Sequence, residues 1–175
     1  MRDFKIVFDM DEVIVQFLKK LLKEYNLKFN KNLTEKDFTE WQFGQDIANI
    51  FLQEGFFDDL EPYPNAIEIV SKLKKDKFGI LIATDAAGQA SIAKSKFNWL
   101  RKHMPFIDCQ KEVIITGSKQ LINANVIVDD SPFFLENFQG IKIAVDKPYN
   151  KNIKTDYRVY NDTIEEIYDI VHRII

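Results

Sequence analysis

Four short apolar segments, each ending in polar residues, limit the folds that this chain can adopt. Because they are apolar throughout rather than at alternate positions, they are typical of strands buried on both faces of a parallel sheet. The segments run from Lys5 to Asp9, from Gly79 to Thr84, from Glu112 to Thr116 and from Val126 to Asp130. Two later runs, Lys142 to Asp146 and Tyr157 to Tyr160, continue the pattern and predict a fifth and a sixth strand.

Amphipathic segments lie between these strands, notably Ala66 to Lys75 and Gln89 to His103, and they predict helices. Strands that alternate with helices indicate crossover units and therefore an α/β fold with a parallel sheet. In such sheets, ligands bind at the carboxyl ends of the strands. The polar residues that fall at these ends include Asp9, Asp11, Thr84, Asp129 and Asp130.

One long segment interrupts the alternation, because about seventy residues separate the first two strands, far more than a simple crossover needs. Val13 to Tyr25 has a helical pattern, Thr34 to Asp37 resembles a helix start, and Asp46 to Gln53 has apolar residues at helical spacing. Pro62 and Pro64 mark the return to the sheet. The segment is expected to be an inserted helical cap.

The length of 175 residues fits one well-packed domain with a small insertion. The expected division is a core of residues 1–15 and 62–175 and a small helical cap of residues 16–61. The formal net charge of −3 does not provide the positive field that binds long nucleic acid. A small anionic ligand remains compatible with it, because a few lysines and one metal ion can outweigh a mildly acidic surface.

Several features indicate a cytoplasmic protein without a membrane span. Arg2, Asp3 and Lys5 occupy positions where a signal peptide would need apolar residues. No later apolar run approaches the roughly 20 residues of a membrane span. The single Cys109 cannot form an intrachain disulfide, which fits a reducing compartment.

Asp9 and Asp11 flank Met10 at the end of the first predicted strand. A pair of carboxylates at a strand end can bind a divalent cation beside a phosphoryl group. On its own the pair is a weak signal, because such pairs also occur by chance or as structural caps. Its interpretation therefore depends on the other strand ends.

The other strand ends carry the groups that a phosphoryl-transfer site needs. Thr84 offers a hydroxyl to phosphate oxygens, and Lys119 offers a positive charge. Asp129 and Asp130 offer carboxylate oxygens, the hard ligands that Mg²⁺ prefers. Each has an ordinary alternative: a strand-end cap, a solvated lysine, and a turn before Ser131. Their coincidence at strand ends favours phosphoryl transfer.

With these residues together, the chain resembles the phosphatases of the haloacid dehalogenase superfamily, and more narrowly the 5′(3′)-deoxyribonucleotidase family. The resemblance covers almost the whole chain. The segments that carry the narrower resemblance are Leu33 to Trp41, Phe56 to Ala66, Lys96 to Leu100, Thr116 to Lys119 and Ala124 to Asp130. It implies a three-layer, Rossmann-like haloacid dehalogenase core with a parallel sheet, and a small helical cap inserted after the first strand.

The resemblance also implies a Mg²⁺-dependent mechanism. Asp9 would attack phosphorus to form an aspartyl-phosphate, and Asp11 would act first as general acid and then as general base. The Asp9 carboxylate, the Asp11 backbone carbonyl and one or both of Asp129 and Asp130 would hold Mg²⁺, while Lys119 would balance negative charge. Because neighbouring residues on a strand point oppositely, we expect one of the last two aspartates to bind metal and the other to orient the ligands.

The substrate-binding residues that the resemblance implies are Thr84, Asp85, Lys96, Lys119, Phe17 and Trp41. Phe17 and Trp41 match aromatic residues that close over base and sugar, although core packing is an alternative for both. Lys96 matches a lysine near the phosphate, but it could equally be exposed. Many relatives have Gly where this chain has Glu12, and Ser where it has Asp85. Compared with those relatives, this chain carries two additional negative charges near the site. If Asp85 faced the phosphate, repulsion would cost about 4 kcal/mol, so backbone donors are the expected contacts there.

Three functions remain open at this point. The first is release of phosphate from deoxyribonucleoside 5′- or 3′-monophosphates, and the second is the same chemistry on another small phosphometabolite. The third is a non-enzymatic, phospho-accepting receiver domain, although receivers carry the phosphorylated Asp on the third strand, where this chain has Ile115-Thr116-Gly117. The sequence leaves open the preferred base, the choice between 5′- and 3′-phosphate, and the discrimination between deoxyribose and ribose. It also leaves open whether the protein forms a homodimer.

Overall fold

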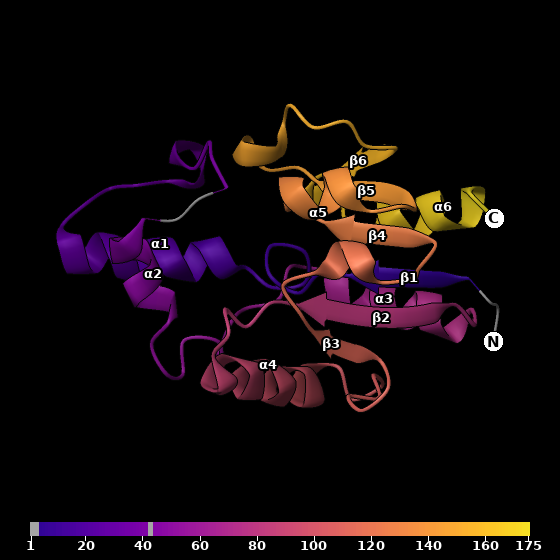
Figure 1. Ribbon diagram of the computed structural model, residues 1–175, viewed down its shortest axis with the longest axis horizontal. Coiled ribbons are helices and arrows are strands. Elements are labelled where there is room, and N and C mark those ends of the chain that lie inside the picture. Colours follow the sequence, from indigo (N-terminus) through magenta and orange to yellow (C-terminus); the bar gives the residue numbers. More distant parts are fainter. Residues whose placement is uncertain (1–3, 42–43) are drawn as a thin grey trace.

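The computed structural model describes residues 4–41 and 44–175, and it is a parallel sheet with helices packed around it (Figure 1). Arg2 and Asp3, on which the expectation about a signal peptide partly rested, lie outside the described residues. Within the two described ranges, no helix is both long enough and apolar enough to cross a membrane.

In the described ranges, six parallel strands form the sheet in the order β3-β2-β1-β4-β5-β6. The strands are β1 Lys5–Phe8, β2 Gly79–Thr84, β3 Val113–Ile115, β4 Val126–Asp129, β5 Ile141–Val145 and β6 Tyr157–Val159. All six predicted strands are confirmed to within one residue at each end. The order is that of a doubly wound Rossmann-like sheet, whereas receiver domains have the order 2-1-3-4-5. The receiver alternative is therefore wrong.

Strand β1 lies at the centre of the sheet. Val7 is opposite Leu81 of β2 on one side and Ile127 of β4 on the other. Beyond the strand, the backbone N–H of Asp9 donates to the carbonyl of Val128 at 2.9 Å. This bond keeps the carboxyl ends of β1 and β4 level, so that the acidic residues following both strands share one edge of the sheet.

Helices cover both faces of the sheet and give three layers. The helices that follow residue 61 are α3 Ala66–Lys75, α4 Ala90–His103, α5 Pro132–Asn137 and α6 Glu166–Arg173. Phe8 belongs to the apolar cluster that includes α3 and α6, whereas Val7 belongs to the cluster that includes α5. Because successive strand side chains point to opposite faces, these two clusters are the two halves of the core. The expected three-layer α/β core is confirmed.

Residues 16–61, called the inserted segment below, lie between β1 and β2. Their described part includes α1 Phe17–Phe29 and α2 Gln45–Phe51. Figure 1 shows α1 and α2 beyond the carboxyl ends of the strands. The helix expected from Asp46 to Gln53 is thus confirmed as α2. The helix start expected at Thr34 amounts to one 3-10 turn, in which the carboxylate of Asp37 accepts hydrogen bonds from the backbone and hydroxyl of Thr34.

The start predicted for the first helix is wrong by four residues. The pattern from Val13 to Tyr25 predicts a helix, but α1 begins at Phe17. Glu12 has a φ of 58°, which lies outside the right-handed helical region. The backbone N–H of Ile14 then donates to the carbonyl of Met10 at 2.8 Å and closes a turn. The apolar residues before α1 are therefore buried by this turn rather than by a helix face.

Candidate active site

The carboxylate of Asp9 lies at the carboxyl end of β1, next to the ammonium group of Lys119. Asp9 is 4% exposed and Lys119 is 2% exposed. Nζ of Lys119 lies 2.6 Å from Oδ2 of Asp9 and 3.0 Å from Oδ2 of Asp129. Burial alone would lower the pKa of Lys119, but Asp129 and Asp9 outweigh burial and raise this pKa above its ordinary value. The lysine therefore holds a fixed positive charge between two carboxylates.

Asp130 completes a group of three buried carboxylates with Asp9 and Asp129. Within the described part of the chain, one oxygen of each lies within 4.8 Å of the others. Burial raises the pKa of Asp129 to about 7, with Lys119 opposing the shift and Asp9 adding to it. Burial also raises the pKa of Asp130, and the charges of Asp129 and Asp9 add to this shift. A divalent cation would relieve this repulsion, and three carboxylates are ligands suited to Mg²⁺.

The two aspartates at the end of β4 have different partners. Oδ2 of Asp129 faces Lys119, and its Oδ1 accepts a hydrogen bond from the backbone N–H of Ser131 at 2.8 Å. Oδ2 of Asp130 accepts a hydrogen bond from the hydroxyl of Tyr149, whereas Oδ1 is buried and has no hydrogen-bond partner among the described residues. Asp130 directly follows the last residue of β4. Which of the two aspartates binds the metal directly stays a prediction.

Lys96, on α4, connects Asp11 to the end of β2. The lysine is 1% exposed, so the alternative of a solvated side chain is wrong. Its Nζ lies 2.5 Å from Oδ2 of Asp11 and donates to the hydroxyl of Thr84 at 2.8 Å and to the carbonyl of Asp85 at 2.7 Å. The ammonium also packs over the ring of Phe57, 4.6 Å from its centroid. These contacts hold a positive charge beside Asp11.

Asp11 keeps one carboxylate oxygen without a hydrogen bond. Its Oδ1 is buried and has no such partner among the residues that the structure describes. Burial raises the pKa of Asp11, with Lys96 opposing the shift and Asp9 adding to it. A carboxyl group whose pKa is raised retains its proton closer to neutral pH, as a general acid must.

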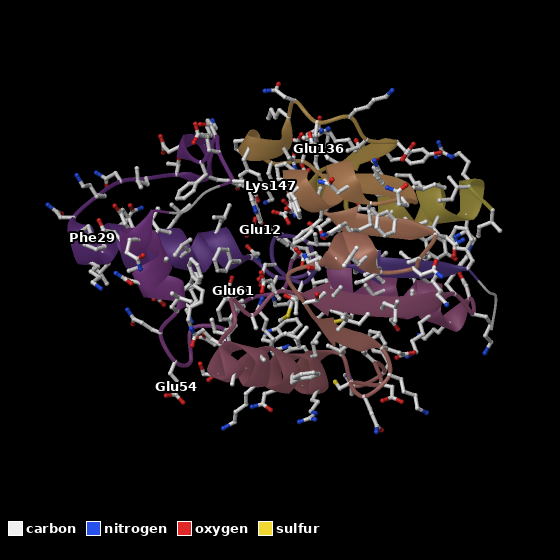
Figure 2. The ribbon with its side chains drawn as sticks, in the orientation of Figure 1. Glu12, Phe29, Glu54, Glu61, Glu136 and Lys147 are labelled. Carbon is white, nitrogen blue, oxygen red and sulfur yellow. The ribbon has the colours of Figure 1, made fainter. Side chains whose placement is uncertain are left out.

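Glu12 has the backbone conformation that glycine adopts most easily, with a φ of 58°. The buried carboxylate of Glu12 accepts hydrogen bonds from the backbone N–H of Leu18 at 2.6 Å and from the hydroxyl of Tyr63 at 2.7 Å, and it pairs with Lys147. Figure 2 shows Glu12 and Lys147 at the junction of the inserted segment and the sheet. The charge expected beside the substrate is therefore balanced by a buried lysine.

The carboxylate of Asp85 is engaged with its own loop. Oδ1 accepts a hydrogen bond from the backbone N–H of Ala87 at 2.8 Å. Two successive positions of this turn are left-handed, with a φ of 48° at Ala87 and 71° at Gly88. A Cβ added at Gly117 would lie 3.3 Å from Oδ2 of Asp85, so the neighbouring loop can approach this carboxylate because it has glycine there.

A pocket of about 170 Å³ lies between the acidic residues and the inserted segment. Its polar wall includes Asp11, Lys96 and Asp130, and its apolar wall includes the two aromatic residues expected to cover a substrate. A larger, shallower hollow of about 600 Å³ lies beside α3 and contains none of the predicted site residues. The smaller pocket is therefore the candidate substrate site, because several of the predicted site residues line it.

Phe17 and Trp41, which line this pocket, differ in their packing. Phe17 is buried, and its ring lies 5.6 to 5.8 Å from those of Phe51, Phe56 and Phe57, so it both packs and lines the pocket. Trp41 is 37% exposed, and its ring lies 5.0 Å from that of Tyr149.

Comparison with known proteins identifies the family of this chain. Over residues 2–174 the sequence matches the family described as 5′ nucleotidase, deoxy (Pyrimidine), cytosolic type C protein. The chain belongs to this family. A 5′(3′)-deoxyribonucleotidase of Bacillus subtilis is 30% identical over 161 residues, which cover 89% of this chain and 92% of the relative. A 5′(3′)-deoxyribonucleotidase of Clostridium acetobutylicum is 29% identical over 152 residues, which cover 82% of each.

Solved structures share the fold of this nucleotidase-family chain at much lower identity. A haloacid dehalogenase-family hydrolase from Deinococcus radiodurans, solved with bound phosphate and sodium, has a TM-score of 0.65 and 11% identity over 97% of this chain and 95% of that one. The hydrolase YfnB from Bacillus subtilis, solved with bound magnesium, has a TM-score of 0.59 and 15% identity over 98% and 100%. The fold and family that the sequence resembles are both confirmed.

The structure of this nucleotidase-family member adds site residues that the sequence pattern did not predict. Lys147, Tyr149 and Asn150 follow β5 and contact Glu12 and Asp130. The available signal was their position, because they form a polar run at the carboxyl end of a predicted strand. The same rule had pointed to the acids after β1 and β4.

Proposed function

We propose that the protein is a Mg²⁺-dependent phosphomonoesterase that dephosphorylates deoxyribonucleoside 5′- or 3′-monophosphates. The observation that carries this proposal is the position of Asp9, whose carboxylate is held 2.6 Å from Lys119 and within 4.8 Å of two further carboxylates. The adjoining pocket has an aromatic wall suited to a nucleoside. The 5′(3′)-deoxyribonucleotidases related to this chain support the substrate class.

The residues present fit a magnesium ion. Asp9, the backbone carbonyl of Asp11 and Asp130 would bind it directly, and Asp129 would orient the site through Lys119 and Ser131. The unpartnered Oδ1 of Asp130 supports this division, because both oxygens of Asp129 already have partners. When bound, Mg²⁺ would neutralise charge on the phosphate oxygens and so reduce their repulsion of the attacking carboxylate.

In the first step, a carboxylate oxygen of Asp9 attacks phosphorus and the bond between phosphorus and the sugar oxygen breaks. Asp11 gives its proton to the departing oxygen, so that the nucleoside leaves as an alcohol. The raised pKa of Asp11 and the unpartnered Oδ1 of its carboxyl group support this role. Lys119 balances the charge of Asp9 and of the phosphoryl group.

In the second step, water attacks phosphorus in the aspartyl-phosphate. Asp11, now a carboxylate, takes a proton from this water, and the bond between phosphorus and Asp9 breaks. Inorganic phosphate leaves, and both aspartates return to their starting states. The contact between Lys96 and Oδ2 of Asp11 leaves Oδ1 for both proton transfers.

The substrate would lie between the sheet edge and the inserted segment. Thr84, Lys96 and backbone donors of the Asp85 loop would contact the phosphate, while Phe17 and Trp41 would cover the nucleoside. In this proposal residues 16–61 are a small cap on a core of residues 1–15 and 62–175. The placement of α1 and α2 beyond the carboxyl ends of the strands supports this division (Figure 1).

A substrate panel with Asp11→Asn tests the proposal. With Mg²⁺, the purified protein should release phosphate from dUMP, dTMP or 3′-dUMP, and Asp11→Asn should lower kcat by about 10²–10⁴, as expected for loss of a general acid and base. Circular dichroism should show that the variant is folded. If the protein hydrolysed a sugar phosphate well but released no phosphate from any of these nucleotides, the proposed nucleotide substrate would be overturned. Another small phosphometabolite would then be favoured.

A further inference from the structure

The loop of residues 147–150, which follows β5, touches both the inserted segment and the proposed metal site. On the side of the inserted segment, Nζ of Lys147 lies 2.9 Å from Oε1 of Glu35, and the ring of Tyr149 lies 5.0 Å from that of Trp41. On the other side, the hydroxyl of Tyr149 donates to Oδ2 of Asp130. One short loop thus connects two parts of the site that are far apart in sequence.

The loop is held firmly by its own buried contacts. Asn150 is fully buried, and its Nδ2 donates to the carbonyls of Asp130 and Val145, each at 2.8 Å. Arg158 of β6 donates to Oδ1 of Asn150 at 2.7 Å. These bonds fix the loop backbone to the sheet edge, so the contact with Asp130 depends on the position of the Tyr149 side chain.

The hydrogen bond from Tyr149 decides which oxygen of Asp130 remains unpartnered. Oδ2 accepts the tyrosine hydroxyl, so the buried Oδ1 is the oxygen that the described residues leave without a hydrogen bond, next to the group of three carboxylates. Hydrogen bonds of this kind fix the orientation of metal-ligating carboxylates and commonly change metal affinity. The same tyrosine ring packs against Trp41, which lies in the inserted segment.

We propose that Tyr149 is a positioning residue that couples the docking of the inserted segment onto the core to the metal-binding orientation of Asp130. The inference rests on the proposed role of Asp130 as a Mg²⁺ ligand. When Glu35 and Trp41 contact the loop, Tyr149 is held where its hydroxyl reaches Asp130. Coupling between sites is reciprocal, so Mg²⁺ bound to Asp130 in turn stabilises the docked position of the inserted segment.

Magnesium affinity, measured by isothermal titration calorimetry, tests the coupling without substrate. Tyr149→Phe keeps the ring but removes the hydroxyl, and it should weaken Mg²⁺ binding about 10-fold or more. Glu35→Gln removes the charged contact of the inserted segment with Lys147, and it should weaken Mg²⁺ binding about 5-fold although Glu35 touches none of the three carboxylates. Glu35 is half-exposed, so its substitution should leave the fold intact.

Two matched substitutions serve as controls. Tyr168→Phe removes a tyrosine hydroxyl that donates to Asp76, and Glu61→Gln removes the exposed contact of Glu61 with Lys19 in the inserted segment. Both should bind Mg²⁺ as the wild type does. In the double variant, Tyr149→Phe should remove the effect of Glu35→Gln, because the hydroxyl that transmits this effect is gone.

The outcomes separate the coupling from the ligand assignment. Wild-type Mg²⁺ affinity in Glu35→Gln, or full additivity in the double variant, would overturn the coupling. If Asp130→Asn also bound Mg²⁺ as tightly as wild type, the proposed role of Asp130 would fail instead. Loss of binding in Asp130→Asn with unchanged binding in Tyr149→Phe and Glu35→Gln would leave the proposed function standing and refute only the coupling.

Discussion

Glu12 shows how the contacts of one side chain offset an unfavourable backbone conformation. A non-glycine residue in the left-handed region is disfavoured by roughly 1–2 kcal/mol. Both oxygens of the Glu12 carboxylate have partners. The carboxylate accepts hydrogen bonds from Leu18 in the first turn of α1 and from Tyr63, and it pairs with Lys147. The turn that carries Asp11, the start of α1 and the 147–150 loop therefore meet at one buried ion pair.

Lys147→Met should destabilise the protein strongly. The substitution leaves the buried carboxylate of Glu12 without its ammonium partner, and breaking a buried pair in this way typically costs about 3–5 kcal/mol. The free energy of unfolding can be measured by urea denaturation followed by circular dichroism. Adding Glu12→Gln to Lys147→Met should recover part of the loss, because the unpaired charge is then removed.

The exposed pair of Lys19 and Glu61 provides the control for this experiment. Lys19→Met removes the same kind of charge from a solvated position and should change the free energy of unfolding little. Equal losses in Lys19→Met and Lys147→Met, or no recovery in the double variant, would show that the buried pair does not have the role assigned to it.

At the scale of elements, the inserted segment reaches the site through aromatic packing. Phe17 begins α1 and contacts Phe51 of α2, so the two helices and the wall of the pocket share the same rings. Trp41 also lines the pocket, and its ring packs against Tyr149 of the 147–150 loop. The shape of the pocket consequently depends on how these elements pack together.

Phe17→Leu should raise KM for deoxyribonucleoside monophosphates with a smaller effect on kcat. Leucine retains an apolar side chain at this position but removes the flat ring, and stacking of a base on an aromatic ring contributes about 1–3 kcal/mol. We expect a rise in KM of about 5-fold or more, measured by steady-state phosphate release. Phe138→Leu changes a buried ring in the cluster on the other face of the sheet and serves as the control. A similar rise in KM for both variants would assign Phe17 to core packing alone.

The sequence predicted those elements that leave a recognisable pattern within a short stretch of residues. The strands could be recognised because parallel strands buried on both faces are apolar throughout, and the acids at their ends followed from the strands. The start of α1 could not be predicted, because the left-handed backbone of Glu12 leaves no trace in apolar periodicity. The burial of Lys96 and the contacts of Tyr149 were also inaccessible, since they depend on partners 85 and 19 residues away in the chain.

At the scale of the whole molecule, the carboxyl ends of β1 and β4 bring unbalanced negative charge to a buried position. Asp9, Asp129 and Asp130 lie together, and Lys119 pairs directly with the first two of them, whereas Lys96 pairs with Asp11. The pKa of Asp129 is raised to about 7 by burial, with Lys119 opposing and Asp9 adding to the shift. Folding therefore favours bound protons or a bound cation at this edge of the sheet.

Without a metal ion, the protein should lose stability as the pH rises from about 4 through about 7. In this range the folded state binds more protons than the unfolded state, because the pKa of Asp129 is raised from 3.8 to about 7 on folding, and the pKa of Asp130 is raised as well. The slope of the free energy of unfolding against pH is then negative. Thermal unfolding in EDTA across this range measures the slope.

Mg²⁺ should stabilise the protein more at pH 8 than at pH 5.5, because protons compete with the cation for the same carboxylates. At 100 times its dissociation constant, the ion should add about 2.7 kcal/mol to the free energy of unfolding. The comparison is thermal unfolding with Mg²⁺ and with EDTA at both pH values, and Asp130→Asn should lose most of the difference at pH 8. A Mg²⁺ effect that is equal at the two pH values, or that survives in Asp130→Asn, would place the cation away from these carboxylates.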